Sequence, residues 1–248
     1  QKSDWVEPGP LDLPGYNPTL EPNPKMIQQA ANLIKNSNKP ILYVGGGIIH
    51  SKANQELFNL ATKFNIPVVT TLMGRGAFPD GHELCLEMPG MHGNYTATTS
   101  IQKSDLLIAI GVRFDDRVTA NPSFFAQNAK VIHADIDPAE IGKVREAQVP
   151  IVGDAKSVIL GLVNALGDTK LNTENWINEL NSMKNEFPLS YNQNENGPLK
   201  VPFVLEELQN LTEEDAIVVS GVGQHQMWIS QHWNFTEPNT WLNSGGLG

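Results

Sequence analysis

The sequence is poor in the residues on which several classes of protein depend. It has one cysteine, Cys85, which excludes an internal disulfide framework and a zinc site built from several cysteines. No apolar run approaches the roughly 18 residues that a membrane-spanning helix needs, and the first residues contain no signal-peptide hydrophobic region. Lys and Arg number 17 against 27 Asp and Glu, and the net charge of -10 repels phosphate backbones. We therefore expect neither a membrane nor a nucleic acid as a partner.

Several catalytic signatures are missing as well. The six histidines show no H-x-H or H-E-x-x-H spacing, which argues against a histidine metal site. There is no G-K-[ST] phosphate loop, no G-x-S-x-G elbow and no evident base to activate Cys85. The chain begins with Gln1 rather than methionine, from which we expect it to be a piece of a longer protein. None of these signatures identifies a catalytic residue or a metal site.

The chain does contain a regular alternation of strands and helices. With 40% apolar and 18% charged residues it can bury a sizeable core. Apolar runs predict strands at 41–44, 67–70, 106–110, 131–134 and 151–152, and apolar residues at helical spacing predict helices from residue 24, over 53–64 and over 155–166. Continuous apolar strands between helices are typical of a parallel sheet with helices on both faces. The predicted fold class is α/β and Rossmann-like.

Composition divides the chain into four parts. Residues 1–23 are expected to form a proline-rich connector along a surface, and residues 24–168 the α/β domain. Residues 169–200 contain a predicted helix at 172–187 and a polar linker at 191–198. Residues 201–248 begin a second α/β unit, with a helix at 201–211, a strand at 216–219 and a turn at 221–223. We expect this unit to be truncated and to expose apolar side chains around Ile217–Val219 and Trp228.

Glycines follow the first predicted strand, where a ligand of a parallel sheet is expected. Such ligands bind beyond the carboxyl ends of the strands, which here are residues 45–47, 70–73, 111–117, 135–137 and 153–154. Gly45-Gly46-Gly47 could bring backbone close to an anion, but it is equally typical of a tight strand-to-helix turn. The G-x-G-x-x-G fingerprint fails because His50 takes the place of its last glycine, and the turn at 221–223 fails likewise with Gln226.

Arginines and acids alternate just beyond the third strand. Arg113 and Arg117 carry donor forks that match phosphate oxygens. With Asp115 and Asp116 they could instead form a surface lattice of ion pairs that contributes little to stability. The position of the segment at the predicted ligand edge makes the two interpretations equally strong.

Acids also end the fourth and fifth strands. Asp135 and Asp154 could accept hydrogen bonds from a ribose or an adenine amino group, and Asp135 with Asp137 could bind a hard cation. Asp137 followed by proline is more typical of a helix N-cap. His92 could be a base or a ring contact, although a lone histidine is more often structural, and His133 lies within a strand and is expected in the core.

Taken in order, these segments resemble one family over nearly the whole chain. The motifs are Gly-Gly-Gly at 45–47, Thr-Thr-Leu-Met-Gly at 70–74, Gly-Met-His-Gly at 90–93, Gly-Val-Arg-Phe-Asp-Asp-Arg-Val at 111–118, Asp-Ile-Asp-Pro-Ala-Glu-Ile at 135–141, Gly-Asp at 153–154, Gly-Val-Gly-Gln-His-Gln-Met-Trp at 221–228 and Ser-Gly-Gly-Leu-Gly at 244–248. They are similar to the large catalytic subunit of acetohydroxyacid synthase, also called acetolactate synthase. The motifs at 111–118 and 221–228 are the most specific.

The resemblance implies an enzyme of branched-chain amino-acid biosynthesis that condenses two pyruvates, or pyruvate with 2-oxobutyrate. Such enzymes use thiamine diphosphate, Mg2+ and FAD, and they have three α/β domains. This chain resembles the central, FAD-associated domain and the opening of the third, diphosphate-binding domain. The resemblance further implies a homodimer or tetramer of the full-length subunit, a regulatory small subunit as a possible partner, and a cytoplasmic location in bacteria or a plastid or mitochondrial one in eukaryotes.

The resemblance also assigns cofactor-binding residues. FAD contacts would fall on Gly45, Gly46, Gly47, Thr71, Leu72, Met73, Met91, His92, Gly111, Arg113, Asp115, Arg117, Val118, Asp135, Ile136, Gly153 and Asp154. Arg113 would meet the FAD diphosphate, and Asp135 and Asp154 its adenosine half. Thiamine diphosphate contacts would fall on Val222, Gly223, Gln224, His225 and Gly248.

Two departures from the family pattern matter. Met88-Pro89 precedes Gly90 where the family leads us to expect leucine before the glycine, and the proline should stiffen this loop. The family's catalytic glutamate belongs to its first domain, and the Gly-Asp-Gly signature that holds Mg2+ does not occur in these residues. We therefore expect the chain alone to be inactive. The alternatives are the central domain of a related thiamine-diphosphate enzyme, such as glyoxylate carboligase or pyruvate oxidase, and a stand-alone nucleotide-binding module.

Overall fold

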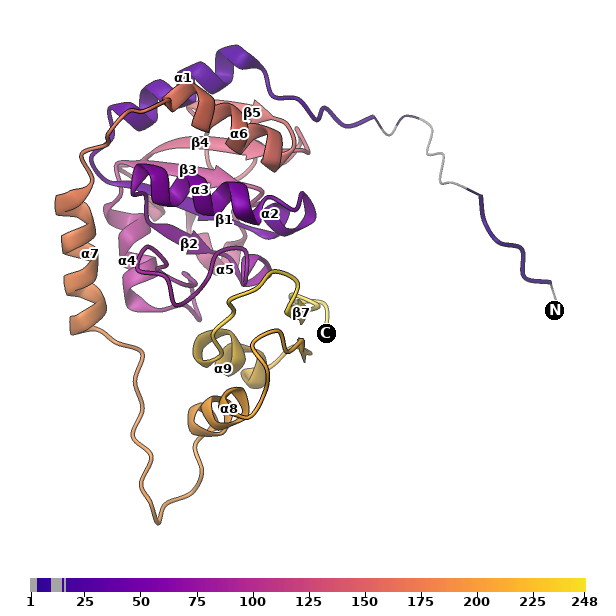
Figure 1. Ribbon diagram of the computed structural model, residues 1–248, viewed down its shortest axis with the longest axis vertical. Helices are drawn as coiled ribbons and strands as arrows, with labels where there is room; N and C mark the ends of the chain where they lie inside the picture. Colours follow the sequence, from indigo (N-terminus) through magenta and orange to yellow (C-terminus); the bar gives the residue numbers. More distant parts are fainter. Residues whose placement is uncertain (1–3, 10–14, 16) are drawn as a thin grey trace.

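The computed structural model describes residues 4–9, 15 and 17–248, and its centre is a parallel five-stranded sheet (Figure 1). The strand order is β2-β1-β3-β4-β5, which confirms the predicted α/β class. β1 and β3 pair along their full length: Pro40 lies opposite Leu106 at one end, and Val44 lies opposite Ile110 at the other. The strands are β1 (Pro40–Val44), β2 (Val68–Thr70), β3 (Leu106–Ile110), β4 (Lys130–Asp135) and β5 (Val149–Val152).

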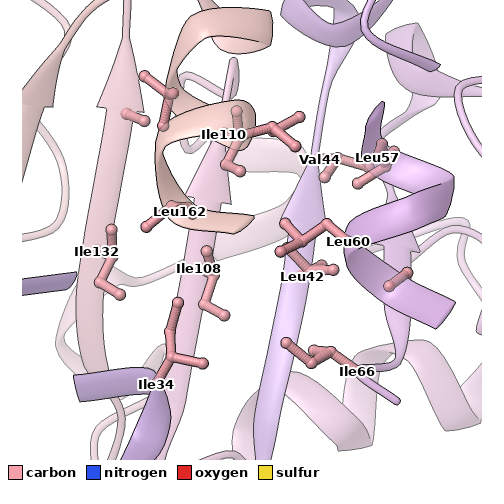
Figure 2. Close-up of a cluster of buried hydrophobic side chains, with 14 of the residues drawn as sticks. Ile34, Leu42, Val44, Leu57, Leu60, Ile66, Ile108, Ile110, Ile132 and Leu162 are labelled. Atoms are coloured by element: carbon pink, nitrogen blue, oxygen red, sulfur yellow. The ribbon is translucent and has the colours of Figure 1, made fainter. Parts of the chain in front are cut away.

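One face of the sheet is covered by three helices, α1 (Pro24–Lys35), α3 (Asn54–Phe64) and α6 (Ala155–Leu166). Alternate strand residues point into this layer, where Leu42, Val44 and Ile108 meet Leu60 of α3 and Leu162 of α6 (Figure 2). Helical spacing supplies the apolar stripe of α1, whose buried residues are Ile27, Ala30, Ala31 and Ile34. Asn23 caps α1 by accepting a hydrogen bond from the Lys25 amide, directly before the N1 proline.

The opposite face is covered by α4 (Tyr95–Lys103) and α7 (Glu174–Glu186). The remaining strand residues, among them Ile41 and Leu107, point into this second layer. Trp176 of α7 is fully buried there, and its indole nitrogen donates to the Pro40 carbonyl oxygen at 3.2 Å. Because both faces are covered, every residue of β1 and β3 is buried, which is why these strands read as continuous apolar runs.

Both outer strands of the sheet are blocked. The segment 84–87 runs along the free edge of β2, where the Val68 and Thr70 amides donate to the Leu84 and Glu87 carbonyl oxygens at 2.8 and 3.0 Å. β5, at the other edge, contains Pro150, which has no amide hydrogen. The parallel sheet therefore offers little unpaired backbone to another strand.

The chain between α7 and residue 201 forms no helix or strand, and a smaller C-terminal unit follows (Figure 1). Its elements are α8 (Val201–Asn210), β6 (Val218–Ser220), α9 (Gln224–His232) and β7 (Trp241–Asn243), with β6 and β7 parallel. The strand β6 begins two residues later and ends one residue later than the predicted 216–219. As expected, Ile217, Val219 and Trp228 are exposed, by 64%, 71% and 37%.

The N-terminal connector is exposed near its start and contacts the sheet near its end. Residues 4–9 are exposed and carry no regular structure, and Figure 1 shows this part of the chain leading away from the sheet. Leu20–Pro22 pack against the end of β5, where the Asp154 amide donates to the Leu20 carbonyl oxygen at 2.8 Å and Pro22 lies against Gly153. Pro10 and Pro14 of the predicted connector lie outside the described residues.

Candidate functional site: the carboxyl edge of the sheet

The predicted ligand segments meet at one edge of the molecule. All five strands are parallel, so the segments at 45–47, 71–73, 111–118, 135–136 and 153–154 all follow the carboxyl ends of strands. Neighbouring segments are joined through their backbones. The Gly111 amide donates to the Ala134 carbonyl oxygen at 2.9 Å, and the Gly153 amide donates to the Asp135 carbonyl oxygen at 3.0 Å. We call this set of segments, together with residues 90–93, which are hydrogen-bonded to 111–118, the rim.

The glycines of the rim allow backbones to approach one another. A Cβ atom added at Gly45 would lie 2.4 Å from the Gly111 carbonyl oxygen, and one added at Gly47 would lie 2.6 Å from the Gly111 Cα. The Gly45 and Gly47 amides donate to the carbonyl oxygens of Ile110 and Gly111, both at 3.2 Å. These two amides therefore serve the fold, which supports the tight-turn interpretation. A short helix, α2 (Gly46–His50), follows the turn.

The loop after β2 packs directly on this glycine turn. The Thr71 amide donates to the Val44 carbonyl oxygen at 2.9 Å, and a Cβ atom at Gly74 would lie 3.0 Å from the Gly45 Cα. The loop forms a 3-10 helix, η1 (Leu72–Gly74). Thr71 and Leu72 are half-buried and Met73 is exposed, so of the three predicted residues only Met73 presents its side chain fully to solvent.

Residues 90–93 and 111–118 form the next part of the rim. The Met91 amide donates to the Arg117 carbonyl oxygen at 2.9 Å, and a Cβ atom at Gly90 would lie 2.7 Å from that same oxygen. Gly90 has a φ of +99°, so this position favours glycine both for its conformation and for its close contact. The turn beyond Pro89 is equally tight, because a Cβ atom at Gly93 would lie 2.2 Å from the Met88 carbonyl oxygen. His92 and Val118 are half-buried.

Phe114 fixes the direction of the charged side chains after β3. It has a φ of +53° and is buried against Tyr43 and His133, whereas Arg113 and Asp115 on either side of it are exposed. Asp115 caps α5 (Asp116–Thr119) by accepting from the Arg117 amide at 3.0 Å. A buried residue in the left-handed region is a strained arrangement of the kind often found at functional sites.

The arginines of this segment have weak partners. Arg117 lies 3.8 Å from an Asp116 carboxylate oxygen, with both side chains more than two-thirds exposed. Such a pair contributes little to stability. Arg113 forms no ion pair with any of the residues that the structure describes. Both guanidinium groups are therefore available to an anion at the rim.

The acids at the ends of β4 and β5 are partly engaged by the chain. Asp135 accepts from the Asp137 amide at 3.0 Å, and burial raises the pKa of the Asp135 carboxyl. Asp154 is the N-cap of α6 and accepts from the Lys156 amide at 3.0 Å. Asp137 accepts from the Ala139 amide at 2.9 Å, but a turn rather than the expected helix follows it. The chain returns to β4 instead, where the Gly142 amide donates to His133 Nδ1 at 3.4 Å.

The rim also carries apolar side chains that the fold leaves exposed. Met73, Met91 and Ile136 are exposed by 45%, 62% and 39%. Long apolar side chains exposed beside cationic ones suit a ligand with a flat apolar part and an anionic part. The rim fits such a ligand through these side chains and its arginines. It does not offer the amides of Gly45 and Gly47.

The second predicted cofactor segment belongs to the C-terminal unit. Val222, Gln224 and His225 are exposed around the N-terminus of α9, Gly223 is half-buried, and Gly248 is exposed. Gln226, which stands in the third glycine position, is buried and donates to Asn243 Oδ1 and to the Gly245 carbonyl oxygen, both at 2.8 Å. This side chain ties the turn to the end of β7. In the sequence, the only indication of this contact is that a polar residue, Gln226, occupies the position of the third glycine.

Three further observations concern metal ligands, membrane-spanning helices and His133. Within the residues that the structure describes, no group of three His, Cys, Asp or Glu residues could hold a metal ion, and no helix is long and apolar enough to cross a membrane. His133 is fully buried, with Nε2 2.9 Å from the Val112 carbonyl oxygen, which confirms its predicted place in the core.

Comparison with known proteins assigns the chain to a family. Residues 27–162, more than half of the chain, match the family model described as "Thiamine pyrophosphate enzyme, central domain", so the chain belongs to the thiamine pyrophosphate enzyme family. It is 51% identical over 248 residues to the acetolactate synthase large subunit of Corynebacterium glutamicum, and 51% identical over 251 residues to the acetolactate synthase of Mycobacterium leprae. It is also 44% identical to acetolactate synthase 2, chloroplastic, of Nicotiana tabacum.

These alignments cover nearly all of this chain but only part of each relative. They include 99%, 100% and 99% of the chain, and 40%, 40% and 37% of the three relatives. The chain therefore spans about two-fifths of the length of the curated relatives that it matches.

Proposed function

We propose that the chain is the central part of an acetolactate synthase, followed by the opening of its diphosphate-binding domain. The parent enzyme condenses two pyruvates to 2-acetolactate, or pyruvate with 2-oxobutyrate, in branched-chain amino-acid biosynthesis. The support is the identity of 51% and 44% to proteins of that name along essentially the whole chain. In this proposal residues 24–168 are the FAD-associated domain, 169–200 a helix and linker, and 201–248 the start of the thiamine-diphosphate domain.

We further propose that the rim binds FAD. This proposal rests on exposed apolar side chains that lie along the same edge as two guanidinium groups, of which Arg117 has one weak ion pair and Arg113 has none with the described residues. Arg113 would meet the diphosphate, Met73, Met91 and Ile136 would contact the flat rings, and Asp135 with Asp154 would lie toward the adenosine. The glycines at 45–47 and 111 contribute by letting the rim segments pack closely, rather than by offering amides to the anion.

The C-terminal turn would contact thiamine diphosphate through Val222, Gly223, Gln224 and His225, with Gly248 at the edge of that site. When bound with Mg2+, thiamine diphosphate supplies the carbanion chemistry of the family. The 248 residues contain neither the family's Gly-Asp-Gly metal signature nor a residue that we assign as catalytic. We therefore propose that the chain alone binds FAD but forms no acetolactate. An acetoin assay with all three cofactors tests the second half of this statement.

The proposal extends to partners and location. The parent enzyme would assemble as a homodimer or tetramer, with a regulatory small subunit as a further partner. It would lie in the bacterial cytoplasm, or in a plastid or mitochondrion of a eukaryote. The names of the relatives, one a bacterial large subunit and one a chloroplastic enzyme, support both locations equally.

Flavin titration of two arginine variants tests the assignment of the rim. Arg113→Ala should weaken FAD binding more than Arg117→Ala, because Arg113 lies closer to the end of β3. Loss of one partner of a charge-assisted bond costs about 1.5–3 kcal/mol, which is roughly tenfold or more in affinity. Lys63→Ala, which removes an exposed cation from the C-terminal end of α3, is the matched control and should bind FAD as the wild type does. Equal affinities of the Arg113 and Arg117 variants would refute the assignment.

A further inference from the structure

Two hydrogen bonds between residues distant in sequence join the C-terminal unit to the rim. The Trp241 indole nitrogen donates to the Leu72 carbonyl oxygen at 3.0 Å, and Gln231 Nε2 donates to the His92 carbonyl oxygen at 2.7 Å. Met73 Sδ lies within 3.9 Å of the position that a Cβ atom on Gly245 would occupy. Both rim loops that carry exposed methionines are therefore held by the C-terminal unit.

A buried ion pair lies in the loop just beyond η1. Arg75 and Asp80 form two parallel hydrogen bonds, of 2.7 Å from Nη1 to Oδ1 and 2.6 Å from Nη2 to Oδ2, and each side chain is 1% exposed. Burial raises the pKa of the Asp80 carboxyl to about 6, against the opposing effects of the Arg75 charge and the Phe235 amide. Both carboxylate oxygens accept hydrogen bonds, as those of an ionised carboxylate do, and Arg75 balances the charge.

The same carboxylate reaches into the C-terminal unit. The Phe235 amide donates to Asp80 Oδ2 at 2.7 Å, and the Asp80 amide donates to the Phe235 carbonyl oxygen at 3.2 Å. The Phe235 ring, which packs against Trp241, lies 5.5 Å from the Arg75 guanidinium carbon. Arg75, Asp80 and Phe235 thus form one buried cluster drawn from both units, which we call the clasp.

A buried ion pair is costly to form, because both charges lose their hydration, and an apolar pair of similar size is often as stable. The stability of the loop alone is therefore a weak reason for this cluster. The Asp80 carboxylate accepts four hydrogen bonds: two from Arg75, one from the Cys85 thiol at 3.7 Å and one from the Phe235 amide. The bond from Phe235 spans 155 residues of sequence. An ionised acceptor also fixes the position of a backbone amide more strictly than apolar packing does.

We propose that Arg75 and Asp80 are positioning residues, and that the clasp fixes the C-terminal unit, with its turn at 221–225, on the loop that follows β2. Arg75 orients the carboxylate, and the carboxylate holds the backbone at Phe235. Without the hydrogen bond from the Phe235 amide to Asp80, the C-terminal unit is held less firmly, and the hydrogen bonds from Trp241 to Leu72 and from Gln231 to His92 form less often. This role does not depend on which ligand the rim binds.

Hydrogen exchange on the complete chain tests the clasp. The double variant Arg75→Met/Asp80→Leu removes both charges without leaving either one buried and unpaired. In it, amides of 224–243 should exchange about tenfold faster or more, since the backbone at Phe235 loses a charge-assisted bond. Amides of β3 should exchange as in the wild type. The double variant Lys63→Met/Asp168→Leu removes an exposed ion pair, 3.3 Å long, and is the matched control that should leave both regions unchanged.

A second variant separates the backbone contact from the aromatic one. Phe235→Leu keeps the amide that donates to Asp80, so it should accelerate exchange of 224–243 less than the charge-pair variant does. Unchanged exchange of 224–243 in the charge-pair variant would overturn the proposal. Equal acceleration in β3 and in 224–243 would also overturn it, because the pair would then stabilise the whole fold rather than position one unit.

Discussion

Replacing Gly45 with alanine tests what the glycines of the rim are for. The backbone of Gly45, with φ -126° and ψ -165°, is accessible to any residue, so the substitution introduces no conformational strain. Its cost is steric, because the new Cβ would lie 2.4 Å from the Gly111 carbonyl oxygen and 2.9 Å from Val112 Cγ1. The first of these is a backbone atom that hydrogen bonds hold in place, since the Gly47 amide donates to it.

Overpacking of this kind costs about 1–3 kcal/mol, and contact with a fixed backbone atom places Gly45→Ala near the upper value. For a chain of this size that corresponds to a fall in Tm of roughly 6–12 °C, which calorimetry or circular dichroism measures directly. FAD affinity should fall as well, because β1 and β3 would end farther apart.

Two further glycines provide the controls. Gly81→Ala places its Cβ in open space and should leave Tm unchanged. Gly46→Ala meets the Met73 carbonyl oxygen at 3.3 Å, a contact that a small shift relieves, so its stability should stay within about 1 kcal/mol of the wild type. If Gly46→Ala were as destabilising as Gly45→Ala, or if Gly45→Ala were as stable as the wild type, the close-packing argument would be wrong.

Three more predictions concern pH, proteolysis and the flavin. Burial lowers the pKa of His133, and both nitrogens of its neutral ring form hydrogen bonds. The neutral ring therefore stabilises the fold fully above pH 6.5, and this stabilisation is lost as the pH falls through the lowered pKa of His133. Between pH 7 and pH 5, the free energy of unfolding measured with denaturant should fall by at most about 1.4 kcal/mol per pH unit. His133→Gln should reduce this pH dependence, whereas substitution of the exposed His50 by glutamine should leave it unchanged. Limited proteolysis should cut within 191–198 and spare 24–168, and mass spectrometry of a cut inside the sheet would contradict this. A redox-inactive flavin analogue should preserve turnover of the parent enzyme, since the condensation transfers no net electrons; a bound analogue without turnover would disprove it.

The sheet could be predicted from the sequence because its strands are buried on both faces. Ile41–Val44 and 106–110 are apolar at every position, whereas a strand with one face in water alternates between apolar and polar residues. The C-terminal strands carry a weaker signal. Apolar residues around Ile217 indicate a strand, but its register depends on pairing with Trp241–Asn243, three residues that show no pattern of their own. The predicted strand therefore began two residues too early, and β7 was not predicted.

Part of the candidate site could likewise be predicted from the sequence, and part of it could not. Strand ends could be located because a parallel topology brings them to one edge, whatever the side chains are. The contacts that hold the C-terminal unit could not be predicted, since Gln231 and His92 are 139 residues apart and the donor or acceptor is often a backbone atom of any residue type. Asp137 shows the limit of local rules. Its cap and proline are present, but the tertiary bond from Gly142 to His133 turns the chain back before a helix can form.

The two blocked edges of the sheet restrict how copies of this protein can associate. A second molecule cannot readily extend the sheet, because one edge is occupied by the segment at 84–87 and the other contains Pro150. We therefore expect association through the five-stranded sheet domain to use side chains on helices and loops, whose identity sets the specificity. Such contacts are sensitive to single surface substitutions, whereas strand pairing depends mainly on backbone atoms. Substitutions on the helical faces should consequently change self-association more strongly than substitutions along β2 or β5.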